Sequence, residues 1–143
     1  MQSSLKSNSY IHHHRVGYAE TDKMQFLHHS NYARIYENAR WEFFRSLNIP
    51  YSAIEEKGLF MPVINMDFKF IKPAFYDDNL SIEVRVENIL NIKLAFTYRT
   101  FNQNSELINE AMVTLAFIKA DSGKPVRTPE FIKERLITKT VLV

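Results

Sequence analysis

One helical stripe and a series of alternating segments organise the hydrophobic pattern of this chain. From Asn31 to Leu47 the apolar residues recur every three or four positions, which is typical of a helix with one buried face. The members of this stripe are Tyr32, Ile35, Tyr36, Ala39, Phe43 and Leu47. Ser30 occupies the position of an N-cap, and the segment Asn48–Pro50 is expected to end the helix, because Asn tolerates a left-handed cap and Pro cannot continue a helix.

Later segments alternate apolar and polar residues with a period of two, which predicts strands with an apolar face. They are Val63–Lys72, Leu80–Glu87, Ile92–Phe101 and Glu106–Lys119. The last segment is apolar on both faces after Ala111, which favours a central position in a sheet. Short turns, predicted at Asn88–Asn91 and Asn102–Ser105, separate the last three strands, so these strands are expected to pair antiparallel.

Shorter elements complete the pattern. The polar segment Met1–Ser9 is expected to be loosely held, and Tyr10–Tyr18 is predicted to form a first strand. A short helix over Tyr51–Lys57 should end at Gly58, and a last helix should open with Thr128 as its cap and Pro129 as its first residue. An apolar-faced sheet and an apolar-striped helix bury each other, so we expect a single α+β domain over residues 1–143, with an antiparallel sheet wrapped around the long central helix.

Composition narrows the class of protein. A chain of 143 residues with 45% hydrophobic and 24% charged residues is typical of one globular domain. The net charge of +2 and the scattered basic residues give no reason to expect a nucleic-acid partner, and the absence of Cys excludes thiolate metal sites and Cys nucleophiles. The chain shows neither an apolar signal segment nor a run near the ~18 apolar residues of a membrane span. We therefore expect a cytoplasmic protein without stable membrane insertion.

The junction between the first strand and the long helix concentrates polar chemistry. The chain there runs from Tyr18 through Glu20 to Asp22, and His29 stands just before the helix. A helix N-terminus presents unpaired N–H groups and the positive end of a dipole, which can stabilise an oxyanion. A carboxylate beside it can activate water or attack a carbonyl carbon itself. Asp22 is therefore the leading catalytic candidate with His29 as its partner; the simpler alternative is that Asp22 caps a turn and His29 binds the backbone.

Two other polar groups have simpler explanations than catalysis. His12, His13 and His14 are adjacent on a predicted strand, so neighbours point to opposite faces and cannot converge on one metal ion. No metal site is predicted. Glu37 offers a rival carboxylate on the helix, but it stands three residues before Arg40, and an ion pair between the two is the simpler interpretation.

The residues of the junction resemble a known family signature. The matching residues are Tyr18, Glu20-Thr21-Asp22, His29-Ser30-Asn31-Tyr32 and Tyr36-Glu37-Asn38-Ala39-Arg40, followed by Met61-Pro62-Val63 and the run from Ile71 to Asp78. They are similar to hotdog-fold acyl-CoA thioesterases of the 4-hydroxybenzoyl-CoA thioesterase type and to their Tol–Pal-associated relatives, and the resemblance extends from about Ile11 to Arg135. One difference is Gln25, where the family usually has Gly; a side chain there would narrow the pocket or shift the backbone.

The resemblance implies a hotdog fold and the hydrolysis of an acyl-CoA thioester to free acid and CoA. It implies that Asp22 acts as general base or nucleophile, that His29 assists, and that amides near the helix N-terminus form the oxyanion hole. No cofactor is implied, since CoA enters as part of the substrate. Relatives contact the CoA nucleotide at positions that correspond here to Lys93, Lys124 and Arg127.

The resemblance also implies an assembly. Family members pair two sheets edge to edge and place the site between subunits, so we expect a homodimer or a homotetramer. Three other activities remain open: hydrolysis of acyl-carrier-protein thioesters, hydration of an enoyl thioester, and non-catalytic binding of acyl-CoA.

Overall fold

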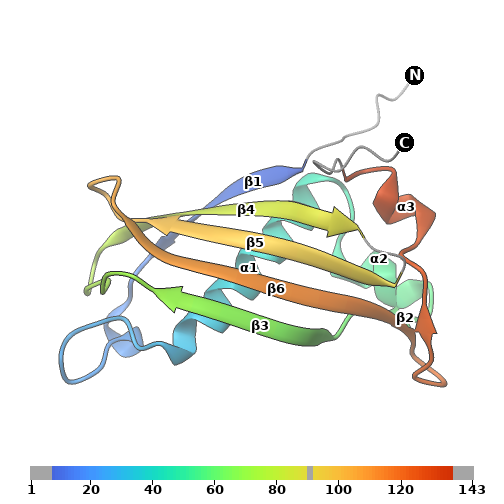
Figure 1. The fold of residues 1–143 in the computed structure, drawn as a ribbon, viewed down its shortest axis with the longest axis horizontal. Helices are drawn as coiled ribbons and strands as arrows, with labels where there is room; N and C mark the ends of the chain where they lie inside the picture. Colours follow the sequence, from blue (N-terminus) through green and yellow to red (C-terminus); the bar gives the residue numbers. More distant parts are fainter. Residues whose placement is uncertain (1–7, 90–91, 137–143) are drawn as a thin grey trace.

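The long helix α1 (Ser30–Ser46) lies across one face of an antiparallel sheet in the computed structural model (Figure 1). The structure describes residues 8–89 and 92–136. The main strands are β1 (Ser9–Arg15), β3 (Val63–Phe70), β4 (Asn79–Ile89), β5 (Lys93–Phe101) and β6 (Leu107–Lys119). Smaller elements are the 3-10 turn η1 (Tyr18–Glu20), the helices α2 (Tyr51–Glu56) and α3 (Glu130–Lys133), and the strands β2 (Leu59–Phe60) and β7 (Pro125–Val126).

The sheet is ordered β1-β4-β5-β6, and β3 and β2 pair with the side of β6 that faces away from β5. β7 pairs with β6 on the side opposite β2, since Ile118 pairs with both Phe60 and Pro125. Each pairing is antiparallel. The predicted central position of β6 is therefore confirmed, and β1 and β3 lie at opposite edges. At one end of the sheet Phe70 of β3 faces Asn109 of β6, whereas Lys93 of β5 faces Ala116 nearer the other end.

The core forms between the apolar stripe of α1 and the inner face of the sheet. Residues buried from both layers include Ile35, Ala39, Phe43, Phe44, Leu80, Ile82, Val84, Val86, Leu94, Phe96, Val113, Leu115 and Phe117. Burying each of the larger side chains contributes about 1.5–3 kcal/mol, so this interface supplies most of the driving force for folding. The α+β architecture is confirmed.

A polar network crosses the middle of this core. The hydroxyl of Tyr36 donates to Oδ1 of Asn109 at 2.6 Å and lies 2.7 Å from the hydroxyl of Thr100. The Tyr36 ring stacks on Tyr98 at 4.5 Å, and Arg40 donates to the Tyr98 hydroxyl at 2.9 Å. Burial raises the pKa of both tyrosines, so they remain neutral donors and acceptors at any ordinary pH.

Element boundaries agree with the pattern in most places. Asn48 adopts the left-handed conformation expected at the end of α1, with φ of 59°, and Gly58 does the same after α2, with φ of 73°. The last helix begins one residue later than predicted, with Pro129 as its N-cap. β4 continues through Asn88 to Ile89, where a turn was expected, and its pairing with β5 shifts register between Val86 and Asn88. Residues 90–91 of the expected turn lie outside the described residues.

The N-terminal expectation is only partly covered by the structure. Residues 1–7 lie outside the described ranges, and Ser9 already belongs to β1. The segment from Tyr18 to Glu20 is a 3-10 turn, so the prediction that the first strand reaches Tyr18 is wrong. Within the described ranges, no helix is both long enough and apolar enough to cross a bilayer.

Candidate active site

The segment between β1 and α1 folds back as a small hairpin at one end of the sheet. A β-bridge joins Thr21 to Leu27, and the amide of Asp22 donates to the carbonyl of Phe26 at 2.9 Å. A second bridge joins Phe26 to Phe75, after β3. These bonds tie the hairpin to the end of β3, so its position relative to the sheet is fixed.

Asp22 stabilises the tip of this hairpin. Its Oδ1 accepts the amide of Met24 at 2.9 Å and the amide of Phe26 at 3.1 Å. The turn-capping role considered for Asp22 is therefore real, but it occupies only one oxygen: within the described residues no side chain or amide donates to Oδ2. Gln25 has φ of 66°, the left-handed conformation that glycine adopts most easily. Gln25, which differs from the family pattern, therefore occupies a position whose positive φ favours Gly.

Asp22 and His29 line the same cavity, which has a volume of about 300 Å³. Tyr32, Phe70 and Lys72 also contribute to its wall, together with Leu27. The rings of His29 and Phe70 make an edge-to-face contact with their centroids 6.3 Å apart. The rings of Phe70 and Tyr32 make a similar contact with their centroids 5.6 Å apart. Burial, followed by the charge of Asp78, raises the pKa of Tyr32 to about 12, so its hydroxyl stays protonated. The cavity is thus lined by a carboxylate, an imidazole and aromatic rings.

The start of α1 differs from the prediction. His29, not Ser30, is the N-cap, and it makes no side-chain capping bond. Instead Nδ1 of His28 accepts the amide of Ser30 at 3.2 Å and lies 2.8 Å from the Ser30 hydroxyl. The amides of Asn31 and Tyr32 donate to the carbonyls of His28 and His29. Among the described residues, the amide of His29 has no protein acceptor, so it is the N–H group at this helix start that is open to a ligand.

Glu20 connects the elements on which the site is built. Its carboxylate accepts the amide of Gly17 at 2.7 Å, binds Nε2 of His14 at 2.8 Å, and pairs with the guanidinium of Arg34 on α1. Its carbonyl accepts the amide of His28 at 2.8 Å. One side chain thus joins β1, η1 and α1 directly before Asp22. The sequence showed Glu20 only as part of a motif, because these partners come from four separate places in the chain.

Glu37 and Arg40 do not pair as predicted. Arg40 is 4% exposed and donates to the Tyr98 hydroxyl, and the described residues show no ion pair for Glu37. Arg40 turns into the core because the aromatic network offers a buried acceptor there. Glu37 does not line the cavity that Asp22 and His29 share.

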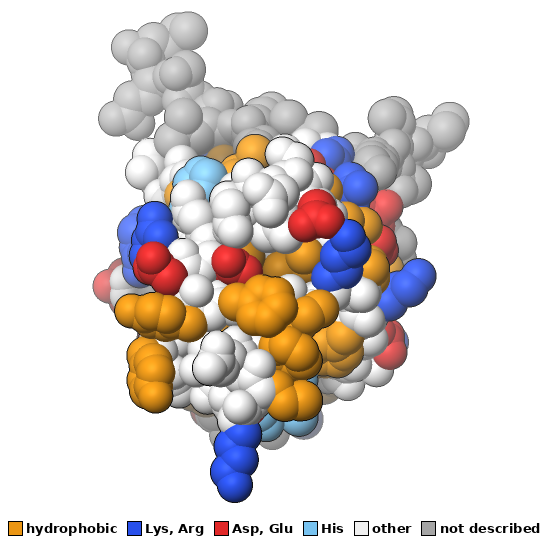
Figure 2. Space-filling view, turned by 90° about the vertical axis from the view of Figure 1, so that its left-hand side faces the viewer, with side chains coloured by type: hydrophobic (Ala, Val, Ile, Leu, Met, Phe, Trp, Pro, Cys, Tyr) orange, Lys and Arg blue, Asp and Glu red, His pale blue; other side chains and the backbone are white. Residues whose placement is uncertain are grey.

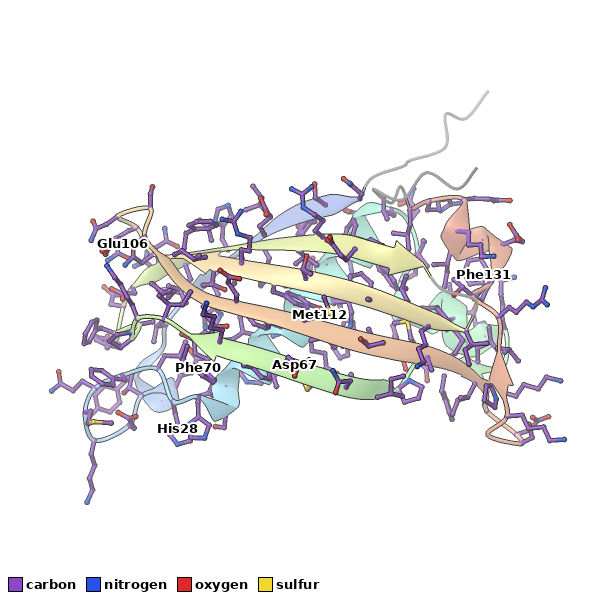
Figure 3. All side chains as sticks on the ribbon, viewed as in Figure 1. His28, Asp67, Phe70, Glu106, Met112 and Phe131 are labelled. Atoms are coloured by element: carbon purple, nitrogen blue, oxygen red, sulfur yellow. The ribbon has the colours of Figure 1, made fainter. Side chains whose placement is uncertain are left out.

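The three cations assigned to the nucleotide lie far from Asp22 within one chain. Lys93 begins β5, whereas Lys124 and Arg127 flank β7. Seven residues of β6 separate the partner of Lys93 from the partner of Phe70, which corresponds to roughly 20 Å along the strand. In Figure 3, His28 and Phe70 lie toward one end of the sheet, and Phe131 of α3 lies at the other end. A single chain does not bring these cations to the cavity.

The end of the molecule that carries the cavity is unusually apolar. Figure 2 shows hydrophobic side chains gathered on this face. Tyr18 is 80% exposed and meets Tyr76 edge to face at 5.8 Å, while Phe70 is 54% exposed. A large apolar side chain left this open beside a cavity marks a surface for a substrate or a partner.

Comparison with known proteins identifies the family. The model of the thioesterase-like superfamily matches residues 16–136. The chain belongs to this superfamily. The expected enzyme class, a thioester hydrolase, is therefore confirmed, and the matched range contains every residue of the cavity described above.

Individual thioesterases agree with this assignment. The acyl-CoA thioester hydrolase YbgC of Escherichia coli is 30% identical over 118 residues, which cover 82% of this chain and 88% of YbgC. The structure of a DHNA-CoA thioesterase from Staphylococcus aureus has a TM-score of 0.82 at 30% identity, with 88% of this chain and 85% of that chain covered. A 4-hydroxybenzoyl CoA thioesterase has a TM-score of 0.82 at 18% identity, covering 89% of this chain and 97% of that chain. This last likeness concerns the fold alone, and the expected hotdog fold is confirmed.

Proposed function

We propose that this thioesterase hydrolyses acyl-CoA to free acid and CoA, with Asp22 as general base or nucleophile. The observation that carries the proposal is that Asp22 and His29 line one cavity at the start of α1, in a chain of the thioesterase-like superfamily. The named activity of YbgC and the CoA thioester substrate named for the Staphylococcus aureus enzyme support CoA as the carrier.

The geometry supports a division of roles. Oδ1 of Asp22 is held by two amides, which leaves Oδ2 for chemistry. As a base, Asp22 takes a proton from water while the water oxygen bonds to the thioester carbon. The charge that develops on the carbonyl oxygen meets the open amide of His29 and the positive end of the α1 dipole. The C–S bond then breaks, and the CoA thiolate takes up a proton, for which the His29 ring in the same cavity is the candidate donor.

The nucleophilic alternative uses the same groups. Oδ2 of Asp22 attacks the thioester carbon, the CoA thiolate leaves, and water cleaves the mixed anhydride that results. Oxygen-18 found in the Asp22 peptide by mass spectrometry, after turnover in labelled water, would establish the anhydride route with attack of water on the aspartyl carbonyl carbon. Only the anhydride route places solvent oxygen in that carboxylate.

The proposed site uses two chains. β3 is an edge strand, and its exposed residues include Val63 at 41% and Ile64 at 48%. Antiparallel pairing of β3 with its copy sets the Val63 end of one strand against the Phe70 end of the other. The partner's β6–β7 end then approaches the cavity, and the substrate phosphates would meet Lys93, Lys124 and Arg127 of the partner subunit. This pairing would also cover an apolar edge that otherwise invites aggregation. A tetramer, a cytoplasmic address and the absence of a cofactor stay predictions.

Asp22→Asn tests the proposal with little disturbance of the fold. The Asn side chain keeps an oxygen for the two amides of the turn but removes the negative charge and the basicity. We expect kcat on a panel of acyl-CoAs to fall about 100-fold or more. Glu42→Gln, in an exposed ion pair with Arg45 on α1, is the matched control and should keep parental activity. Parental turnover by folded Asp22→Asn would refute the mechanism.

The carrier is tested separately. The same acyl group is presented on CoA and on acyl carrier protein, and kcat/KM is compared. A clearly higher kcat/KM on the CoA ester supports the proposal, and a higher kcat/KM on the acyl-carrier-protein ester would identify an acyl-carrier-protein thioesterase. Tight binding of acyl-CoA without turnover would identify a binding protein instead.

A further inference from the structure

The His28 ring holds the first turn of α1 from outside the helix. Its Nδ1 accepts the Ser30 amide, so this nitrogen carries no proton, and the network assigns the ring proton to Nε2. The Ser30 hydroxyl, 2.8 Å away, is then a second donor to the same nitrogen. A ring nitrogen thus supplies the capping that Ser, Thr, Asn or Asp usually supplies from within the N-cap residue.

The same ring also packs on His29. The two imidazole centroids are 4.2 Å apart at an interplanar angle of 31°. The His29 ring also makes an edge-to-face contact with Phe70. The His28 backbone is fixed as well, because its amide donates to Glu20 and its carbonyl accepts the amide of Asn31. The His29 ring therefore contacts a tilted ring and a nearly perpendicular ring, which restrict its orientation.

Among the described residues, His28 itself does not line the cavity that contains Asp22 and His29. Its contacts act on His29, which lines this cavity and whose amide has no acceptor among the described residues. Because the ring of His28 satisfies the neighbouring amide of Ser30, the amide of His29 is the donor left for an oxyanion. Small displacements of such a donor reduce the rate much more than they reduce binding.

We propose that His28 is a positioning residue of this thioesterase, which sets the orientation of the His29 amide and ring without contacting the substrate. The inference rests on the proposed function. It predicts a loss in kcat with little change in KM, since substrate binding uses other groups.

Three variants separate the two contacts. His28→Ala removes both the acceptor and the ring, His28→Asn keeps an acceptor for the Ser30 amide, and His28→Phe keeps a ring on His29. We expect His28→Ala to lower kcat about tenfold with KM within about twofold of the parent, and the other two variants to recover part of the loss. His13→Ala is the matched control, because His13 is exposed on β1 and should leave kcat unchanged.

The outcomes are distinct. Parental kcat in folded His28→Ala, a rise in KM alone, or Asn and Phe variants that are both as slow as the Ala variant would each overturn the inference. If the Ala variant does not fold, a lower kcat at unchanged KM in the Asn or the Phe variant supports the inference, and parental kcat in both variants overturns it. Asp22→Asn is measured in parallel: if it is inactive while the His28 variants are fully active, only this inference fails, and if it is fully active, the proposed function itself fails.

Discussion

Replacing Glu20 by Gln is expected to lower the free energy of unfolding by about 2 kcal/mol near neutral pH. The carboxylate side chain is 13% exposed and binds the Gly17 amide, Nε2 of His14 and the guanidinium of Arg34. Gln retains one acceptor oxygen without charge, which weakens the bonds to Gly17 and His14 by about 0.5–1 kcal/mol each. Arg34 is 49% exposed, so its lost ion pair adds at most about 1 kcal/mol.

The loss should depend on pH in a defined direction. Burial of the Glu20 carboxyl favours the neutral form, but the Gly17 amide, His14 and Arg34 outweigh burial and hold its pKa below the ordinary value of 4.5. Because the folded pKa lies below the unfolded pKa, this stabilisation is complete above the unfolded value and disappears as the pH falls through the folded value. The gap between the parent and Glu20→Gln should therefore narrow below about pH 4.

Urea unfolding followed by circular dichroism at neutral and acid pH measures both effects. Glu42→Gln is the matched control, because it removes the same charge from an ion pair on the surface of α1. Glu42 pairs with Arg45 three residues later, and its side chain is 40% exposed. The control substitution should lower the free energy of unfolding by less than about 0.5 kcal/mol. If Glu20→Gln is no more destabilising than this control, Glu20 does not hold the junction together as argued.

Three further predictions follow from particular residues. Gln25→Gly should raise the free energy of unfolding by about 0.5–1 kcal/mol, because it relieves a left-handed side-chain conformation, and a lower melting temperature would contradict this. Tyr36→Phe should cost about 1–3 kcal/mol in urea unfolding, because it leaves two buried partners unsatisfied, whereas Tyr76→Phe, 55% exposed, should be neutral. Ile64→Lys on β3 should yield monomers in light scattering and lower kcat/KM, because the added charge opposes pairing of this edge with its copy. The control Ile11→Lys, on the opposite edge strand β1, should change neither the oligomeric state nor kcat/KM, and an intact dimer in the Ile64→Lys variant would count against edge pairing.

The large elements could be predicted because each buries one face. The spacing from Tyr32 to Phe43 follows the helical period, and the strands from Leu80 onward follow a period of two, so burial against one common core leaves a readable pattern. β2 and β7 were not predicted because two residues are too few to show a period. The same limit explains η1, a single turn after β1.

The site could be predicted only in part. The approach of Asp22 and His29 to one cavity follows from the strand–turn–helix order, and the two residues lie seven positions apart in the chain. The capping of α1 by His28 could not be predicted, because Ser30 fits the usual preference and only the folded hairpin brings the His28 ring to its amide. Phe70 likewise reaches the cavity through the pairing of β3 with β6, which sequence proximity to Asp22 does not reveal.

The pairing of β3 with a single strand of its own chain has a consequence for how this enzyme should lose activity on heating. Among the described residues β3 is hydrogen-bonded to β6 alone, whereas β5 has a strand on each side. In the proposed dimer the copy of β3 holds its other side, so separation of the two chains leaves β3 held on one side, and such a strand opens at a lower free energy than the whole sheet. Its opening would carry Phe70 and Lys72 out of the cavity wall while the layer between α1 and the inner strands stayed intact. Under gentle warming, inactivation is therefore expected to run ahead of melting, and enzyme that has lost its turnover should still regain it on cooling.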